Sequence, residues 1–252
     1  MPLESRTCLL TRSTAMIGSD MGLDAASARI HGRAVGEVTR RAWLAHCSVA
    51  VAALAGAVPC ARALAKPAKV MVVGDSLSAE YGIARGRGWV ALMEQRLQKE
   101  NAGASVVNAS ISGDTSSGGR TRLPALLAEH KPTHVIVELG SNDALRGLPL
   151  AMTRDNLAAM LRTARAAGAQ VLLVGMRMPP NYGRSYTQEF ESMFASLAKA
   201  EGAALVPFML AGVADSPQAA ALFQDDRIHP NAQAHTIIVD NVWPVLRTQL
   251  KP

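Results

Sequence analysis

The chain has 252 residues, a formal net charge of +6 at pH 7 and an aromatic content of only 4%. This length suits one globular domain with an appended segment better than two full domains. The excess of basic residues is small and does not form patches interleaved with aromatic residues, which argues against nucleic-acid binding.

All three cysteines, Cys8, Cys47 and Cys60, lie within residues 1–65. Residues 66–252 therefore have no disulfide, no thiolate metal site and no cysteine nucleophile. We expect no metal and no other cofactor in this part, because it lacks a cluster of histidine or carboxylate ligands.

Residues 1–65 are predicted to be an N-terminal extension with a signal peptide. Arg40 and Arg41 precede an apolar stretch, residues 47–59, and residues 63–65 offer small side chains for cleavage. The apolar stretch is shorter than the roughly 20 residues that a membrane-spanning helix needs. Both general secretory and twin-arginine export remain open, as does a lipoprotein signal ending at Cys60.

We therefore predict a periplasmic or secreted protein without a permanent membrane span. Residues 1–65 would be removed or disordered, and residues 66–252 would form the functional domain.

In residues 66–252, short runs rich in valine and isoleucine alternate with longer helical patterns. Such alternation predicts parallel strands joined by crossover helices, and hence an open α/β sheet covered on both faces. The expected strands are residues 70–74, 105–108, 134–139, 171–176 and, less clearly, 204–207. The expected helices are residues 89–100, 123–130, 156–167, 189–200 and 232–250, the last kinked by Pro244.

Ligands of such sheets gather beyond the carboxyl ends of the strands. The first expected strand is followed by Gly74, Asp75 and Ser76. Glycine permits a tight turn from strand to helix, which would present the serine hydroxyl at this edge. Ser76 is therefore a candidate nucleophile, although a serine here can also simply cap the next helix.

The second and third strands are followed by loops that contain Gly113 and Asn142. The backbone N–H of Gly113 and the side-chain amide of Asn142 could both donate to a developing negative oxygen. A phosphate-binding loop is a weaker interpretation of the segment around Gly113, because Gly119 and Arg120 stand where that motif needs lysine and serine or threonine. Asn142 could instead be an ordinary turn asparagine.

Near the C-terminus, Asp226 precedes His229 by three residues and Pro230 follows. One turn at this spacing brings the carboxylate to the imidazole, fixing its tautomer and orientation. Together with Ser76, these residues and the two oxyanion donors complete a constellation for acyl transfer. The backbone N–H of Ser76 would be a third donor to the oxyanion.

The same positions resemble the SGNH, or GDSL, hydrolase family, whose serine, glycine, asparagine and histidine match Ser76, Gly113, Asn142 and His229, with Asp226 as the triad aspartate. The resemblance is greater to its bacterial periplasmic branch of acyl thioesterases, lysophospholipases and arylesterases. It rests on residues 107–116, 138–147, 180–184 and 224–231. It implies a three-layer flavodoxin-like sandwich with five parallel strands in the order 2-1-3-4-5.

One position departs from that branch, which commonly has Gly-Gly-Asn-Asp where this chain has Ser141 after Gly140. If the second position requires a positive φ, serine would adopt it at an energetic cost.

The resemblance also implies residues that contact the substrate. The loops at residues 144–149 and 179–186 would flank the acyl site and line an apolar groove, or else merely pack against the domain. The expected contact residues are Asp75, Leu77, Asp143, Leu145, Leu148, Pro180 and Tyr182.

The predicted function is hydrolysis of carboxylic esters or thioesters through an acyl-enzyme, without a metal. Small-molecule or lipid acyl esters, such as acyl thioesters, lysophospholipids and aryl esters, are the expected substrates. A carbohydrate acetyl esterase of the same fold is the alternative enzyme. A non-catalytic periplasmic binding module and a flavodoxin-like nucleotide binder are the alternatives without this chemistry.

Overall fold

The computed structural model describes residues 67–101 and 103–250. The predicted signal peptide lies outside the described residues. Among the helices in the described part, none is long and apolar enough to cross a membrane.

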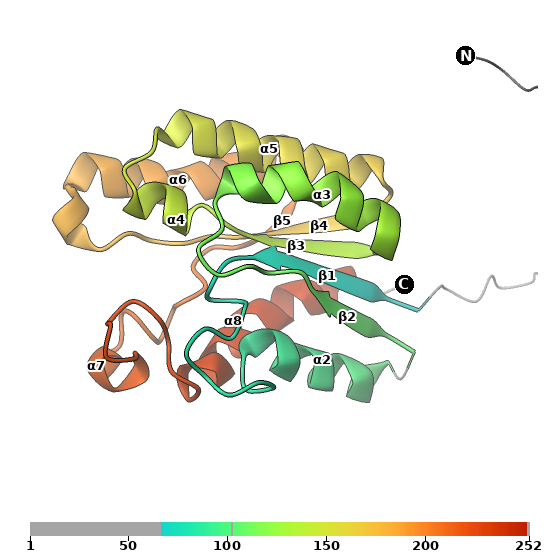
Figure 1. Cartoon of the computed structure of the whole chain (residues 1–252), viewed down its shortest axis with the longest axis horizontal. Coiled ribbons are helices and arrows are strands. Elements are labelled where there is room, and N and C mark those ends of the chain that lie inside the picture. Colours follow the sequence, from blue (N-terminus) through green and yellow to red (C-terminus); the bar gives the residue numbers. More distant parts are fainter. Residues whose placement is uncertain (1–66, 102, 251–252) are drawn as a thin grey trace, which may run out of the picture. The chain divides into compact units, whose positions relative to one another are not determined.

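Five parallel strands form one sheet in the order β2-β1-β3-β4-β5 (Figure 1). This confirms the predicted α/β fold and its strand order. The strands are β1 (Lys69–Gly74), β2 (Ser105–Asn108), β3 (His134–Glu138), β4 (Gln170–Val174) and β5 (Ala204–Val206).

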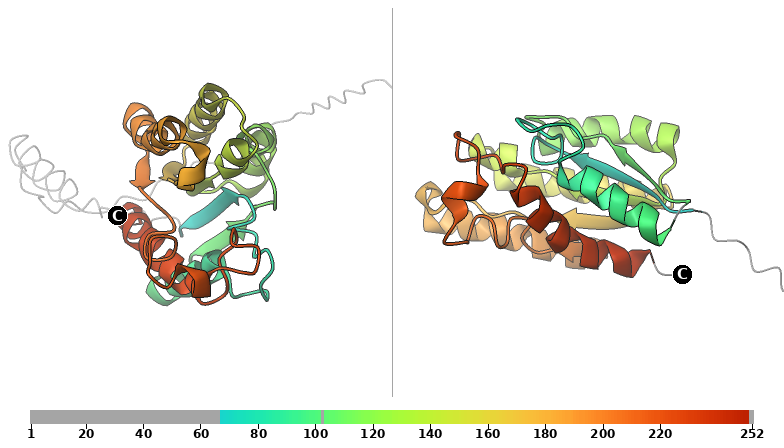
Figure 2. Two further views of the ribbon diagram at one scale, coloured as in Figure 1. Left: turned by 90° about the vertical axis from the view of Figure 1, so that its left-hand side faces the viewer. Right: turned by 90° about the horizontal axis from the view of Figure 1, so that it is seen from below.

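Helices cover both faces of the sheet (Figure 2), with α3, α5 and α6 on one face and α2 and α8 on the other. The three inner strands, β1, β3 and β4, are buried almost throughout, which explains their continuous apolar runs. The longer helices are α2 (Trp89–Glu100), α3 (Ser116–His130), α5 (Leu150–Ala166), α6 (Arg184–Glu201) and α8 (Ala234–Gln249). The short elements are α4 (Ser141–Leu145), η1 (Pro180–Tyr182) and α7 (Ala219–Leu222).

Helix α3 begins seven residues before the predicted start at residue 123. Its first turn contains serine and glycine, which are poor helix formers. The Thr115 side chain caps the helix by accepting from the backbone N–H of Gly118. Ser116 is fully buried and donates its N–H and hydroxyl to Asp143 at 2.8 and 2.5 Å. Contacts from outside the helix therefore set its beginning.

The positive φ in the loop after β3 belongs to Gly140, at 112°, and not to Ser141, which opens α4. Serine at position 141 consequently adopts no left-handed conformation and imposes no backbone strain of that kind. Its side chain is buried, and within the described structure its hydroxyl oxygen has no hydrogen-bond partner.

Candidate active site

The loops that follow the strands meet at the carboxyl edge of the sheet, which faces the viewer in the left panel of Figure 2. Ser76 lies in the turn directly after β1, two residues beyond Gly74. A Cβ at position 74 would lie 2.7 Å from a carboxylate oxygen of Glu138, so the tight turn requires glycine.

Three side chains from distant parts of the sequence form one hydrogen-bonded chain at this edge. The Nε2 atom of His229 lies 2.8 Å from the Ser76 hydroxyl, and its Nδ1 atom lies 2.6 Å from the Asp226 carboxylate. Asp226 also accepts from the backbone N–H groups of His229 and Ile228, both at 2.9 Å. These donors, the His229 N–H foremost, lower the pKa of Asp226 to about 2.

The tautomer of His229 follows from this arrangement. An ionised carboxylate can only accept, so Nδ1 must carry the proton that is shared with Asp226. The Nε2 atom is then free to accept the hydroxyl proton of Ser76, which is the geometry that a general base needs.

A short closed loop carries both Asp226 and His229. Phe223 and Pro230 form an antiparallel bridge at its base, and the backbone N–H of Gln224 donates to the His229 carbonyl at 2.8 Å. The Gln224 side chain donates to the Pro230 carbonyl at 3.0 Å. The spacing recognised in the sequence is thus held by local backbone pairing.

The expected oxyanion donors follow three neighbouring strands: Ser76 lies in the turn after β1, Gly113 in the loop after β2 and Asn142 in α4, after β3. Within the described structure, neither Ser76 nor Gly113 donates its backbone N–H to another protein group. Gly113 has a φ of 78°, a conformation that favours glycine. The Asn142 amide donates one N–H to Asp75 at 3.0 Å and keeps its second N–H.

Asp75 was expected to contact the substrate, but it is only 1% exposed. Its side chain instead forms hydrogen bonds with other groups of the protein. One of its carboxylate oxygens accepts from the Leu77 N–H at 3.0 Å and the other from Asn142. Burial raises the pKa of Asp75 to about 6, although hydrogen bonding and the His229 imidazole oppose the shift. Asp75 is therefore mostly ionised at neutral pH and orients Asn142.

Asp143 is also fully buried and has no surface with which to meet a substrate. Its carboxylate accepts from Ser116 and from the Thr153 hydroxyl, the latter at 3.3 Å. Asp143 thus joins the start of α3 to α4; the loop that carries Gly113 leads into α3, and Asn142 lies in α4 itself.

The remaining expected substrate contacts differ in exposure. Leu77 is 7% exposed and belongs to the core, whereas Leu145 and Tyr182 are 36% and 37% exposed. Leu148 is half-buried. The side chain of Pro180 lies outside the described structure.

The sequence analysis assigned no individual role to three residues that lie around Ser76 and His229. Tyr81 lies against the His229 ring, with 4.3 Å between ring centroids. The Gln224 side chain joins the loop of Tyr81 to the loop of His229, because it donates to the carbonyls of Tyr81 and Pro230. Glu138, at the end of β3, accepts from the Asp75 N–H at 3.3 Å and from the Ser78 hydroxyl at 2.7 Å. Glu138 could have been noticed in the sequence, because it ends an otherwise apolar buried strand.

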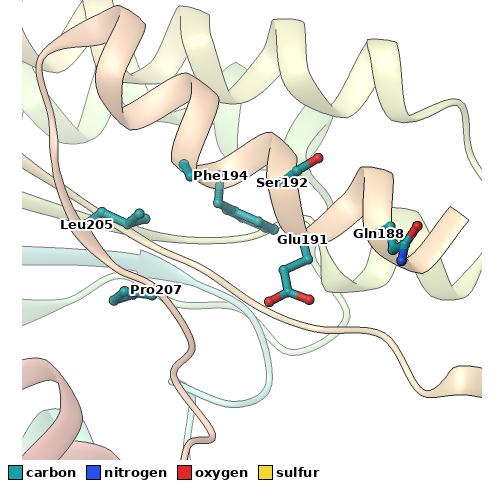
Figure 3. Close-up of a pocket in the computed structure, with 7 residues that line it drawn as sticks. Gln188, Glu191, Ser192, Phe194, Leu205 and Pro207 are labelled. Atoms are coloured by element: carbon teal, nitrogen blue, oxygen red, sulfur yellow. The ribbon is translucent and has the colours of Figure 1, made fainter. Parts of the chain in front are cut away.

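A cavity of about 420 Å³ lies beside α6 and β5 and includes no member of this constellation (Figure 3). Its lining includes Glu191, Phe194 and Pro207. Glu191 is paired with Arg177 at 2.7 Å. Ser76, His229 and Asp226 instead meet at the carboxyl edge of the sheet. Within residues 67–101 and 103–250, no group of three histidine, cysteine or acidic side chains could hold a metal ion.

Comparison with known proteins identifies the family of this chain. A model of the GDSL-like lipase/acylhydrolase family matches residues 72–237. The chain belongs to the GDSL-like lipase/acylhydrolase family. The predicted family is thereby confirmed, and this acylhydrolase is an enzyme that cleaves ester or thioester bonds.

Esterase TesA from Pseudomonas aeruginosa is 50% identical to the acylhydrolase over 181 residues, which cover 72% of this chain and 89% of that protein. Thioesterase 1/protease 1/lysophospholipase L1 from Escherichia coli K12 is 44% identical over 183 residues, covering 73% of this chain and 83% of the relative. A solved structure of the psychrotrophic esterase EstA from Pseudoalteromonas sp., inhibited by monoethylphosphonate, is 38% identical. It has a TM-score of 0.68 and covers 72% of this chain and 98% of its own.

Proposed function

We propose that the acylhydrolase cleaves its substrates through an acyl-enzyme formed on Ser76, with His229 as the base and Asp226 orienting the imidazole. The continuous hydrogen-bonded chain from the Ser76 hydroxyl through His229 to Asp226 is the observation that carries this proposal. Neither a metal nor an organic cofactor is required, because the triad itself activates the nucleophile.

In the first step, Nε2 of His229 takes the proton as the Ser76 oxygen attacks the substrate carbonyl. The resulting oxyanion is held by the free N–H groups of Ser76, Gly113 and Asn142. The tetrahedral intermediate then expels the alcohol or thiol, which takes the proton from His229. Water hydrolyses the acyl-enzyme by the same path and restores the hydroxyl.

The proposed substrates are acyl thioesters, lysophospholipids and aryl esters. The name of the Escherichia coli relative supports the first two classes. Leu145 and Tyr182, exposed after β3 and β4, would contact the acyl chain. Comparing turnover of acetyl, octanoyl and palmitoyl esters would separate this range from a carbohydrate acetyl esterase, which should accept acetyl alone. We place the enzyme in the periplasm or outside the cell, since residues 40–65 have the layout of an export signal.

The decisive test is removal of the nucleophile. Ser76→Ala should lower the kcat for p-nitrophenyl acetate by at least about 10⁴-fold, because no other group can form the acyl-enzyme. It should also abolish labelling by a fluorophosphonate, a reagent suggested by the phosphonate-inhibited esterase EstA.

Ser117→Ala provides the matched control, since Ser117 is an exposed serine at the start of α3. It should keep both turnover and labelling. Turnover or labelling that survives in Ser76→Ala would overturn the proposed mechanism.

A further inference from the structure

The proposed mechanism fixes where the departing group of a substrate must lie. The carbonyl oxygen points toward Gly113 and Asn142, whereas the leaving oxygen or sulfur must reach Nε2 of His229 to take its proton. Whatever stands beside the imidazole therefore contacts the alcohol or thiol portion of the substrate and not its acyl chain.

Tyr81 lies beside the imidazole. Its ring lies 4.3 Å from the His229 ring, with an angle of 40° between the ring planes. The side chain is 49% exposed. It combines an apolar ring with a hydroxyl that has no hydrogen-bond partner within the described structure.

The Tyr81 backbone is fixed from both sides. Its N–H donates to the Ser76 carbonyl at 3.4 Å, and its carbonyl accepts from the Gln224 side chain at 2.9 Å. The next residue, Gly82, has a φ of 70°, and a Cβ there would lie 1.9 Å from the Gln224 amide oxygen. The ring is thus held beside the triad by a loop that is tied to both the serine and the histidine segments.

Support of the imidazole alone does not account for an aromatic ring here. His229 is already oriented by Asp226 at 2.6 Å and by Ser76 at 2.8 Å. An exposed aromatic face beside the proton donor can gain further contact only from a bound molecule, and offset aromatic contacts are favourable beyond the area they bury.

We propose that Tyr81 is a specificity-determining residue that binds the leaving group and favours aromatic alcohols or thiols. This inference rests on the proposed function. In the step concerned, a bond forms between the Ser76 oxygen and the acyl carbon, and the bond from that carbon to the leaving atom breaks. The leaving atom keeps the bonding electron pair and takes the proton from His229.

The test compares phenyl acetate with ethyl acetate, which form the same acetyl-enzyme and differ only in the leaving group. The measured quantity is kcat/KM, because it reports acylation, the step in which the leaving group departs. Tyr81→Ala should lower kcat/KM for phenyl acetate about 3- to 10-fold more than for ethyl acetate, as expected for loss of one aromatic contact. Tyr81→Leu, which keeps bulk without a ring, should show the same selective loss.

Tyr81→Phe keeps the ring and should stay within about twofold of wild type on both esters. Met152→Ala, which truncates an exposed apolar side chain on α5, is a control expected to change neither rate. Equal losses on the two esters in Tyr81→Ala and Tyr81→Leu would overturn the proposal, as would a selective loss in Tyr81→Phe. Failure of the proposed function looks different, since Ser76→Ala would then still hydrolyse the esters.

Discussion

The side-chain amide of Asn142 has two N–H groups, and one of them is committed inside the protein. It donates to Asp75, a buried carboxylate that also accepts from the backbone N–H of Leu77. Since Asp75 lies beside Ser76 in the sequence, a single side chain couples the nucleophile turn to the orientation of the amide. The second N–H of Asn142 is thereby left for the oxyanion.

We predict that Asn142→Ala lowers kcat by about 10² to 10³-fold, as expected for loss of one oxyanion donor. Asp75→Asn should cause a smaller loss, because it weakens the orientation of the amide without removing it. The measurement is kcat for p-nitrophenyl acetate in the two single variants and the double variant.

In the double variant, the Asp75 substitution should add almost nothing, because the group it orients is absent. Full multiplication of the two losses would show that Asp75 acts independently of Asn142. Thermal unfolding of each variant provides the control for folding.

At the scale of elements, the packing of α3 against Leu139 and helix α5 depends on Gly119. A Cβ at this position would lie 2.3 Å from Cδ1 of Leu139 and 3.1 Å from the terminal methyl of Met160, both of which are buried. A glycine inside a helix normally costs about 0.5–1 kcal/mol relative to alanine. Here the close approach of helix and core outweighs that cost.

Gly119→Ala should therefore destabilise the protein, since overpacking typically costs about 1–3 kcal/mol. The measurement is the free energy of unfolding from urea denaturation. The same substitution is also measured in a Leu139→Ala variant, which lacks the atom that the new methyl group would meet. If Gly119→Ala is equally harmful in that variant, the clash with Leu139 is not the cause.

The same helix shows how far the sequence could predict the elements. Strand β2 and helix α2 have the predicted bounds, because apolar periodicity marks them directly. The start of α3 could not be predicted, since Ser116 becomes helical through a hydrogen bond with Asp143, 27 residues away. Helices α5 and α6 likewise begin earlier than their apolar patterns, by six and five residues.

Some residues of the candidate site could likewise be predicted from the sequence, and others could not. Ser76, Asp226 and His229 were recognisable because local spacing places a carboxylate near the imidazole and a serine after the first strand. The burial of Asp75 and the position of Tyr81 depend on how separate loops pack, and local patterns do not encode that packing.

At the scale of the whole molecule, a buried pair of acids affects stability. Glu138 is fully buried, and this burial, with the nearby Asp75 charge, raises its pKa well above 4.5. The Ser78 hydroxyl and the Asp75 N–H face Glu138 and oppose the shift. Above pH 4.5 the unfolded chain therefore releases a proton that the folded protein keeps, so stability falls as pH rises toward the folded-state pKa.

We predict that Glu138→Gln removes this contribution. Glutamine keeps an acceptor for Ser78 but cannot ionise, so the variant should gain stability relative to wild type as pH rises, by up to about 1.4 kcal/mol per pH unit. The measurement is the free energy of unfolding between pH 5 and 8. Asp155→Asn, at an exposed position on α5, should leave the wild-type pH dependence unchanged. Parallel curves for Glu138→Gln and wild type would contradict the prediction.

The bridge between Phe223 and Pro230 has one further consequence. Asp226 and His229 both lie in the segment that this bridge closes. Any displacement of the segment therefore moves the imidazole and the carboxylate together. Such a displacement lengthens the path to the Ser76 oxygen while the base stays correctly aligned with its own partner. Such a displacement would therefore slow proton transfer from Ser76 without changing the tautomer of His229.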